Sequence, residues 1–286
     1  MKTVANLFTD GLQVLRSSPS PRADASLLLS HALEERREWI LAHGDAVASA
    51  RQIAEFESLC RRRAAGLPIA YLLGRAHFYG REFVVDERVL VPRPETEHVV
   101  DEAIAFIRRP MRVLDVGTGC GAIACTIAAQ TSATVDATDS SPRAIEVATL
   151  NAQRLGVDRR CRFHLGDLSE PIGNARFDLV VANLPYVPTA DLPGAPEPVS
   201  YEPRSALDGG PDGLTLYRRL LAQLPPRLNQ GACILFECAP PTIDQLKKLV
   251  HRTFPTFVIE GRPDYAGLSR YVKAVDTSSA LPRAHR

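Results

Sequence analysis

Aromatic residues and unbalanced charge are both scarce in this chain. Aromatic side chains make up 6% of its 286 residues, with a single tryptophan, and 34 Lys and Arg nearly balance 33 Asp and Glu. The formal net charge of +1 argues against a protein held to nucleic acid mainly by a large positive field. The shortage of aromatic rings also disfavours a surface that stacks extruded bases. We therefore expect no direct binding of nucleic acid.

Long hydrophobic runs and cysteine clusters are lacking too. No run reaches the roughly 20 apolar residues that a membrane-spanning helix needs, and residues 1–15 read as an amphipathic helix without a signal-peptide cleavage site. The six cysteines are dispersed, as in proteins with reduced thiols, and no nearby histidine completes a zinc pattern. These features predict a cytoplasmic protein with no membrane segment and no metal.

The chain is longer than one ordinary domain, and its pattern changes along its length. Residues 1–74 show apolar side chains at helical spacing and no convincing strand, which predicts a small helical domain. Residues 75–94 contain extended runs around and after Gly80, which predicts a β-hairpin linker. Residues 95–275 are expected to form the main domain, and residues 276–286 a flexible tail.

In the main domain, short apolar strands alternate with helical stretches. Strands are expected at residues 113–116, 134–137, 161–165, 177–181 and 233–236. Such alternation predicts a parallel sheet covered by helices on both faces. Residues 257–260 and 270–275 are separated by a turn too short for a crossover helix, so they should pair antiparallel. The predicted fold class is α/β: a mostly parallel, Rossmann-like sheet with an antiparallel C-terminal hairpin and a small N-terminal helical domain.

A glycine-rich turn follows the first strand of this sheet and leads into a helix. It consists of Asp115, Val116, Gly117, Thr118, Gly119, Cys120 and Gly121. Glycines there allow tight backbone angles and a close approach of a ligand. The spacing of Gly117, Gly119 and Ala122 also fits a dinucleotide fingerprint, so a nicotinamide-dependent enzyme stays an alternative at this point.

Asp139 stands at the end of the second strand, where its carboxylate can accept hydrogen bonds from ribose hydroxyl groups. The alternative is a structural role as a cap on the helix that begins at Pro142. Because S-adenosylmethionine and NAD both carry this ribose, the glycine turn and Asp139 predict an adenosine-type ligand without choosing between the two.

The motif Asn183-Leu184-Pro185-Tyr186 follows the fourth strand, at the end of a sheet where ligands bind. The Asn183 side-chain oxygen and the Leu184 carbonyl can both accept from one NH₂ group, which would hold a weakly nucleophilic nitrogen in line for transfer. Pro185 constrains the backbone, and Tyr186 offers a flat wall for a planar substrate. The motif therefore indicates methylation of an amide or amine nitrogen; the alternative is a simple turn in which Tyr186 packs.

This motif resembles the (Asp/Asn/Ser)-Pro-Pro-Tyr motif of amino-group methyltransferases. Over roughly residues 20–275, the chain is similar to the release factor glutamine methyltransferases, the HemK/PrmC family. The segments that carry the similarity, in family order, are residues 68–74 (PIAYLLG), 91–97 (VPRPETE), the glycine turn, 183–186 (NLPY), and 201–210 (YEPRSALDGG).

The resemblance implies a class I methyltransferase domain that uses S-adenosyl-L-methionine. The cofactor-binding residues that it implies are Gly117, Thr118, Gly119, Cys120, Gly121, Asp139, Leu168 and Asn183. The catalytic and substrate-binding residues that it implies are Asn183, Leu184, Pro185 and Tyr186. The substrate would be the glutamine in the Gly-Gly-Gln motif of peptide chain release factors, docked by the N-terminal domain. We expect the enzyme to be monomeric.

Three positions depart from the family pattern. Leu184 replaces the first proline of the motif but keeps its carbonyl group. Leu168 stands where an aromatic residue is common. After the fifth strand, residues 237–239 read Glu-Cys-Ala in place of Glu-x-Gly. None of these changes removes a predicted catalytic group.

Residues 187–213 are rich in proline and glycine and show no strand or helix pattern. Long loops of this kind in compact domains often serve function. We expect a substrate-facing flap that carries Tyr201, Glu202 and Arg204.

Three other functions stay open on the sequence. One is methylation of a ribosomal-protein glutamine, and a second is methylation of the exocyclic nitrogen of adenine in nucleic acid. The third is a non-catalytic module that binds S-adenosylmethionine and a partner protein.

Overall fold

The computed structural model describes residues 2–263 and 267–278. The chain forms two compact units, one made of Met1–Arg75 with Pro193–Tyr201 and the other of Ala76–Leu192 with Glu202–Arg286. The predicted flexible tail falls mostly on residues 279–286, which lie outside the described residues. None of the helices in the described ranges combines the length and the apolar character that crossing a bilayer requires.

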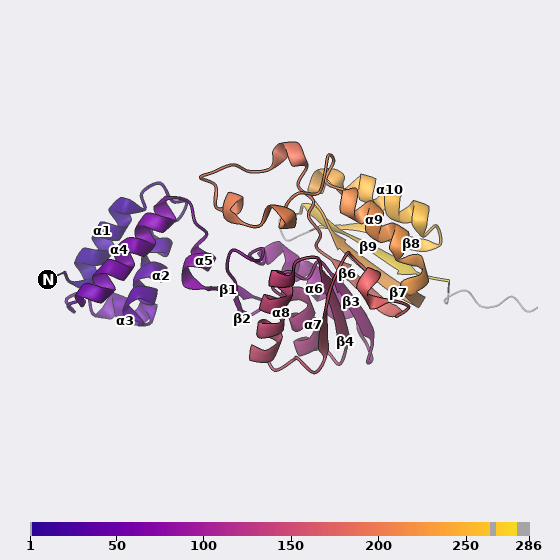
Figure 1. Ribbon diagram of the computed structural model, residues 1–286, viewed down its shortest axis with the longest axis horizontal. Coiled ribbons are helices and arrows are strands. Elements are labelled where there is room, and N and C mark those ends of the chain that lie inside the picture. Colours follow the sequence, from indigo (N-terminus) through magenta and orange to yellow (C-terminus); the bar gives the residue numbers. More distant parts are fainter. Residues whose placement is uncertain (1, 264–266, 279–286) are drawn as a thin grey trace, which may run out of the picture. The chain divides into compact units, whose positions relative to one another are not determined.

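The first unit is a bundle of helices (Figure 1). They are α1 (Val4–Val14), α2 (Pro21–Leu33), α3 (Arg37–Ala42), α4 (Ala50–Ala64) and α5 (Ile69–Leu73). Thr3 and Ser49 begin α1 and α4 with reciprocal capping boxes, which satisfy main-chain amides that a helix start leaves unpaired. The apolar faces meet in a core that includes Leu7, Leu28 and Phe56.

Arg63, in the last turn of α4, belongs to the interior of this bundle. Its guanidinium lies 2.6 Å from the Asp24 carboxylate, and both side chains are about nine-tenths buried. The Ser18 hydroxyl donates to the same carboxylate at 2.6 Å. Hydrogen bonds of this kind offset the cost of burying a charge pair. Because Arg63 is on α4 and Asp24 on α2, the pair holds these two helices together.

A short hairpin follows the bundle in sequence, with β1 (Arg75–Phe78) paired to β2 (Arg81–Val84). Tyr79 and Gly80 connect the strands, and both have positive φ angles, of 51° and 69°. Such a two-residue turn matches the twist of a hairpin. Residues 89–91, expected to be extended, form no strand.

The second unit is built around a seven-stranded sheet in the order β5-β4-β3-β6-β7-β9-β8. The strands are β3 (Arg112–Val116), β4 (Thr134–Asp139), β5 (Cys161–Leu165), β6 (Phe177–Ala182), β7 (Leu228–Glu237), β8 (Phe257–Pro263) and β9 (Ser269–Asp276). The first five are parallel to one another, whereas β9 runs antiparallel to both β7 and β8. The predicted fold class is thereby confirmed.

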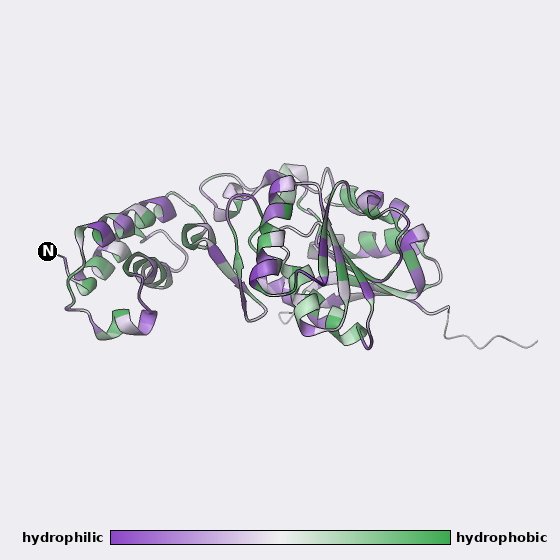
Figure 2. Cartoon of the chain, turned by 60° about the horizontal axis from the view of Figure 1, so that its bottom comes forward, coloured by the Kyte–Doolittle hydropathy of each residue, from purple (hydrophilic) through white to green (hydrophobic). Residues whose placement is uncertain are grey.

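Helices pack on the sheet in two groups. The helices α6 (Glu97–Phe106), α7 (Ala122–Gln130) and α8 (Pro142–Arg154) pack side by side, α6 against β6 and β7, and α7 and α8 against β4 and β5. The helices α9 (Thr215–Gln223) and α10 (Ile243–Thr253) pack against each other, and α10 also covers β8 and β9. The central strands β3, β6 and β7 are buried along most of their length, as expected for a sheet covered on both faces, and their apolar stretches are green in Figure 2.

Two elements differ from the sequence-based expectation. Helix α10 was not expected, although Ile243, Leu246 and Val250 recur at helical spacing and are buried on one face. Strand β7 starts at Leu228, five residues before its apolar run. Its first half is held by pairing with β6 and carries exposed and polar residues, which a search for apolar runs overlooks.

Candidate functional site

The order of the strands determines where a ligand can bind. The chain moves outward from β3 to β4 and β5, then returns to place β6 on the other side of β3. At this switch point the loops after neighbouring strands diverge, which opens a crevice at their carboxyl ends. Val116 and Ala182 are paired across β3 and β6, so the glycine turn and the Asn183 motif begin side by side.

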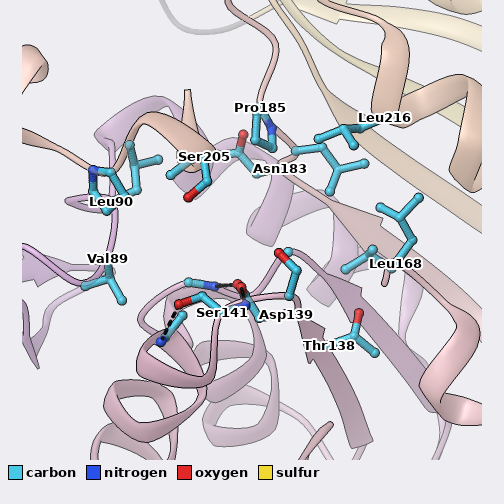
Figure 3. Close-up of a pocket in the computed structure, with 18 of the residues that line it drawn as sticks. Val89, Leu90, Thr138, Asp139, Ser141, Leu168, Asn183, Pro185, Ser205 and Leu216 are labelled. Carbon is cyan, nitrogen blue, oxygen red and sulfur yellow. Dashed lines mark hydrogen bonds between the residues drawn. The ribbon is translucent and has the colours of Figure 1, made fainter. Parts of the chain in front are cut away.

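A pocket lies in this crevice, and Figure 3 shows the side chains around it. The predicted site residues that line it are Gly117, Gly119, Asp139, Leu168, Asn183, Leu184 and Pro185. The predicted residues that do not line it are Thr118, Cys120, Gly121 and Tyr186. The structure therefore brings together groups from the loops after four different strands.

The glycine turn presents its backbone to the pocket. Gly117 and Gly119 have φ angles of 77° and 54°, in the left-handed region that side chains disfavour. The amides of Gly117 and Thr118 both donate to the Thr138 carbonyl, which holds the turn on β4. A Cβ atom at Gly119 would meet no protein atom within 4 Å, so this glycine borders open space.

Asp139 is held by the backbone around it. Its Oδ2 accepts from the Gly119 amide and its Oδ1 from the Ser141 amide, both at 2.9 Å. Burial raises the pKa of the Asp139 carboxyl, and hydrogen bonds from main-chain amides oppose that rise. Ser141, rather than Asp139, is the N-cap of α8, since its hydroxyl accepts from Ala144. Each carboxylate oxygen keeps a further lone pair for a ligand hydroxyl.

Thr118, Cys120 and Gly121 support the turn from behind. The Thr118 hydroxyl donates to the buried Asp115 carboxylate at 2.7 Å. The Cys120 carbonyl accepts from the Asn151 side chain, and burial raises the pKa of the Cys120 thiol to about 12. Their predicted contact with the cofactor stays a prediction, since none of the three faces the pocket described above.

The first two residues of the Asn183 motif are fixed by two side chains from distant parts of the chain. The Asn183 amide nitrogen donates to the Thr96 hydroxyl at 3.2 Å. The Leu184 amide donates to the Tyr217 hydroxyl at 3.2 Å. These bonds leave the Asn183 side-chain oxygen and the Leu184 carbonyl as the acceptors with which the motif can hold an NH₂ group.

Tyr186 points its hydroxyl to Glu237, with 3.4 Å between the phenol oxygen and Oε1. Burial raises the pKa of this phenol beyond its usual range, and the charge of Glu237 adds to the rise. Tyr186 therefore stays protonated at neutral pH. Its predicted role as a wall for the substrate stays a prediction.

The backbone of residues 207–209 forms hydrogen bonds with Val187, the residue that follows the motif. The Val187 amide donates to the Leu207 carbonyl, and the Gly209 amide donates to the Val187 carbonyl at 2.8 Å. A Cβ atom at Gly209 would lie 2.7 Å from the Pro185 carbonyl oxygen, so no larger residue fits without a shift. The Gly-Gly pair that follows the Tyr-Glu-Pro segment thus serves close packing against the motif.

The expected flap over residues 187–213 differs from an open loop. It contains short 3₁₀ turns at Thr189–Asp191, Pro198–Tyr201 and Arg204–Ala206. Glu202 does not face a substrate, because its buried carboxylate accepts from Arg93 at 2.6 Å and from the Val91 amide at 3.2 Å. The prediction for Glu202 was therefore wrong, since a polar residue in a proline-rich loop gives no sign of a distant partner.

Tyr201 also differs from the expected flap. Its hydroxyl donates to the Ala65 carbonyl, and Gly66 packs against Pro196, so residues 193–201 belong to the helical unit. Arg204 is exposed and paired with Asp208.

Several lining residues were missed by the sequence analysis. They are Arg88, Val89, Leu90, Val116, Thr138, Ser140, Ser141, Ala144, Asp167, Pro203, Ser205, Ala206 and Leu216. Asp167 lies two residues after the end of β5, so a search for acidic residues near strand ends, as applied to Asp139, would have found it. Residues 88–90 and 203–206 come from segments far apart in the sequence and carried no such signal.

The lining suits an adenosine derivative. Apolar side chains such as Leu168 and Leu216 can cover a flat base, while Asp139 and Asp167 supply carboxylate acceptors for hydroxyl and amino groups. The open side of Gly119 allows a ligand to approach the backbone. In the described residues, no group of three or more His, Cys, Asp or Glu side chains is arranged to hold a metal ion.

Comparison with known proteins gives two family matches. Residues 6–74 match the family described as PrmC N-terminal domain. Residues 107–227 match a family described as methyltransferase domain.

Curated relatives cover most of the chain. The release factor glutamine methyltransferase of Geobacter sulfurreducens is 40% identical over 232 residues, which are 80% of this chain and 81% of the relative. The enzyme of that name from Koribacter versatilis is 35% identical over 277 residues, covering 94% and 97%. Among solved structures, a methyltransferase from Pyrococcus furiosus superposes with a TM-score of 0.52 at 17% identity, covering 69% of this chain and 90% of that chain, which shows the shared fold.

Proposed function

The chain belongs to the release factor glutamine methyltransferase family, and we propose that Asn183, Leu184, Pro185 and Tyr186 perform its methyl transfer. The enzyme uses S-adenosyl-L-methionine and methylates the side-chain amide of the glutamine in the Gly-Gly-Gln motif of peptide chain release factors. The observation that carries the assignment of the site is the adjacency of the glycine turn and the Asn183 motif at the ends of the paired strands β3 and β6.

We assign the cofactor to the pocket beside these strands. The Asp139 carboxylate would hold the ribose hydroxyl groups, Leu168 would cover the adenine, and the backbone at Gly117 and Gly119 would lie against the remaining chain of the cofactor. When bound, this cofactor supplies an electrophilic methyl group on a positively charged sulfur.

The Asn183 motif acts on the nucleophile. The Asn183 side-chain oxygen and the Leu184 carbonyl each accept one hydrogen from the substrate NH₂ group, which aligns the nitrogen lone pair with the methyl carbon. With that methyl donor in place, the lone pair would form the new N–C bond, and the donor would leave as a neutral thioether that keeps the electrons of the broken S–C bond. Both acceptors stabilise the positive charge that develops on nitrogen. The nitrogen then loses one proton to solvent and becomes a neutral methylamide.

This chemistry does not require a strong base in the site. The leaving group is a neutral thioether, and the protonated product nitrogen is a strong acid that solvent deprotonates readily. Alignment and fixed dipoles therefore supply most of the acceleration.

The substrate assignment extends to the remaining parts of the chain. We propose that the helical unit docks the release factor, that the enzyme works as a monomer, and that it acts in the cytoplasm, where release factors meet ribosomes. The similarity of residues 6–74 to the PrmC N-terminal domain supports the first of these assignments.

The test is incubation of the purified protein with labelled S-adenosylmethionine and purified release factors, followed by mass spectrometry of the product peptides. We expect a single methyl group on the Gly-Gly-Gln glutamine. A release factor with that glutamine replaced by glutamate should accept no label. In parallel reactions with purified ribosomal proteins or with DNA and RNA, label on those substrates, with none on the release factor, would contradict the proposal.

A further inference from the structure

Glu237 occupies an unusual place for a carboxylate. It is the last residue of β7, and only 2% of its surface is exposed. Its Oε1 accepts from the Tyr186 hydroxyl at 3.4 Å, and the Thr96 hydroxyl also lowers the pKa of this carboxyl. Its Oε2 has no hydrogen-bond partner among the described residues. A buried acid is costly to keep, which calls for a reason why it is there.

Thr96 connects this carboxylate to Asn183. The Thr96 hydroxyl is 4% exposed and accepts from the Asn183 amide nitrogen at 3.2 Å. A hydroxyl that accepts one bond still has its own hydrogen to donate. We assign as its acceptor the Glu237 carboxylate, whose pKa the Thr96 hydroxyl lowers and whose Oε2 has no other partner among the described residues. If the Thr96 hydroxyl donates its hydrogen to Glu237, it can only accept from Asn183. The nitrogen of the Asn183 carboxamide must therefore face Thr96. The carboxamide oxygen is then turned toward other partners, as the proposed grip on the substrate needs.

Tyr217 makes a second connection from the same residue. Its fully buried hydroxyl donates to the Glu237 carbonyl and accepts from the Leu184 amide at 3.2 Å. The peptide between Asn183 and Leu184 is thereby fixed against the end of β7. Three of the four residues in the motif thus connect to Glu237. Leu184 does so through the Glu237 main-chain carbonyl, and Asn183 and Tyr186 through its carboxylate.

We propose that Glu237 is the positioning residue of the methyl-acceptor motif: it orients Asn183 through Thr96, holds Leu184 through Tyr217, and binds Tyr186 directly. The inference rests on the proposed role of Asn183 in gripping the substrate amide. Glu237 itself does not line the cofactor pocket, so it acts through these neighbours.

The charge state of Glu237 should matter in the range of ordinary assays. Burial raises its pKa to about 7, with a further rise from Glu95, while hydrogen bonds from Thr96 and Tyr186 and the charge of Arg270 lower it. The ionised carboxylate can accept from both hydroxyls, at Oε1 from Tyr186 and at Oε2, still unpartnered in the described part of the chain, from Thr96. The protonated acid carries a hydrogen of its own and competes for one of those positions. Methyl transfer should therefore rise with pH through about 7.

The kinetic test uses the full-length protein with Glu237→Gln, Thr96→Val and Thr96→Ser. We expect Glu237→Gln and Thr96→Val to lower kcat ten- to a hundredfold, with the Kd for S-adenosylmethionine changed less than threefold by calorimetry. Thr96→Ser keeps the hydroxyl and should recover most of the rate. The rise of kcat with pH should be lost in Glu237→Gln.

Glu102→Gln is the matched control. It also removes one carboxylate charge from a hydrogen-bonded pair, with Lys273 at 2.6 Å, but the pair does not contact the motif. Its kcat and pH profile should stay as in the unaltered protein.

A readout without turnover separates this inference from the proposed function. Protein labelled with ¹⁵N at asparagine shows the Asn183 side-chain NH₂ signals, identified by their loss in Asn183→Ala. In the cofactor-free protein these signals should shift with an apparent pKa near 7, and the shift should vanish in Glu237→Gln.

The outcomes are distinct. If the protein methylates no release factor but the Asn183 signals follow Glu237, the proposed substrate fails and the positioning role stands. If Glu237→Gln keeps the kcat and pH profile of the unaltered protein, or Thr96→Ser is no better than Thr96→Val, the positioning role is wrong. Should Glu237→Gln fail to fold, the comparison between the two Thr96 variants decides.

Discussion

Gly117 lies directly against Leu184: a Cβ atom at position 117 would come within 2.9 Å of the Leu184 Cδ2 atom. The two residues follow neighbouring strands, and one belongs to the turn assigned to the cofactor while the other belongs to the motif assigned to the substrate. The space between the two assigned ligands is therefore set by the absence of one side chain. Glycine is required here for two reasons: the left-handed φ angle, and the lack of room for a side chain next to Leu184.

The first prediction concerns Gly117→Ala. The new methyl group must displace Leu184, and a displacement of the acceptor carbonyl by even a fraction of an ångström should lower kcat/KM by roughly tenfold or more. Gly156→Ala is the control, because Gly156 has a similar φ angle of 68° and no atom within 4 Å of its added Cβ. Both variants should lose about 1 kcal/mol of stability, yet only Gly117→Ala should lose activity. Equal activities of the two variants would contradict the argument.

The second prediction concerns Asp139→Ala. Losing a carboxylate that bonds two ribose hydroxyls should weaken S-adenosylmethionine binding roughly 10- to 100-fold, since hydrogen bonds to charged groups are worth about 1.5–3 kcal/mol. Calorimetry gives the Kd. Asp136→Ala is the control on the same strand, because Asp136 pairs with Arg112 and His164 and does not line the pocket. An unchanged Kd in Asp139→Ala would count against the ribose assignment.

The third prediction concerns Asn183→Ala. Without its carboxamide the substrate nitrogen is no longer aligned, and kcat should fall by roughly a hundredfold or more, as on removal of other oriented polar groups. Cofactor affinity should largely remain, because Asp139 and the glycine turn stay in place. Asn183→Asp keeps an acceptor oxygen but loses the donor to Thr96, so its kcat should be intermediate. Asn229→Ala, which loses a bond to Asp178 elsewhere on the sheet, should retain full activity.

The fourth prediction concerns pH and Asp115, which is fully buried beneath the glycine turn. Burial raises its pKa from 3.8 to about 7, while Thr118 and a main-chain amide oppose the rise. Between these values the folded protein holds a proton that the unfolded chain has released. Stability therefore falls as pH rises from about 4 to 7 and levels off above that range.

Asp115→Asn removes this titration. The loss of stability between pH 4 and pH 7, measured by denaturant unfolding, should become smaller by an amount on the order of 4 kcal/mol at most. An identical pH dependence in the variant would mean that Asp115 is charged in the folded protein. The rise of kcat with pH assigned to Glu237 should persist in this variant, which separates the two buried acids.

The fifth prediction concerns the helical unit. Deleting residues 1–74 removes α1 to α5 and with them the proposed docking surface. Methyl transfer to a short Gly-Gly-Gln peptide should fall much less than transfer to an intact release factor, with the difference appearing mainly in KM. Equal losses on both substrates, in protein that still binds the cofactor, would argue against a docking role.

The sequence by itself determined the class of fold and which strands are followed by loops that carry functional residues. Strands and helices are indicated by short-range patterns of apolar residues, and such patterns are clear at Arg112–Val116 and Thr134–Asp139. The glycine turn, Asp139 and Asn183 could be predicted as neighbours, because the carboxyl ends of parallel strands meet at one edge. The motif at Asn183 indicated methylation of a nitrogen, and the family resemblance supplied the substrate, which the residues alone left open.

Only the tertiary structure decided which side chains support the site. Thr96, Tyr217 and Glu237 lie 87, 33 and 51 residues from their partners Asn183, Leu184 and Tyr186. Likewise, Glu202 is buried against Arg93, and residues 193–201 join the helical unit. A local pattern reports the interactions of neighbours in the chain, whereas these hydrogen bonds exist because β7 packs beside β6 and distant segments fold against them.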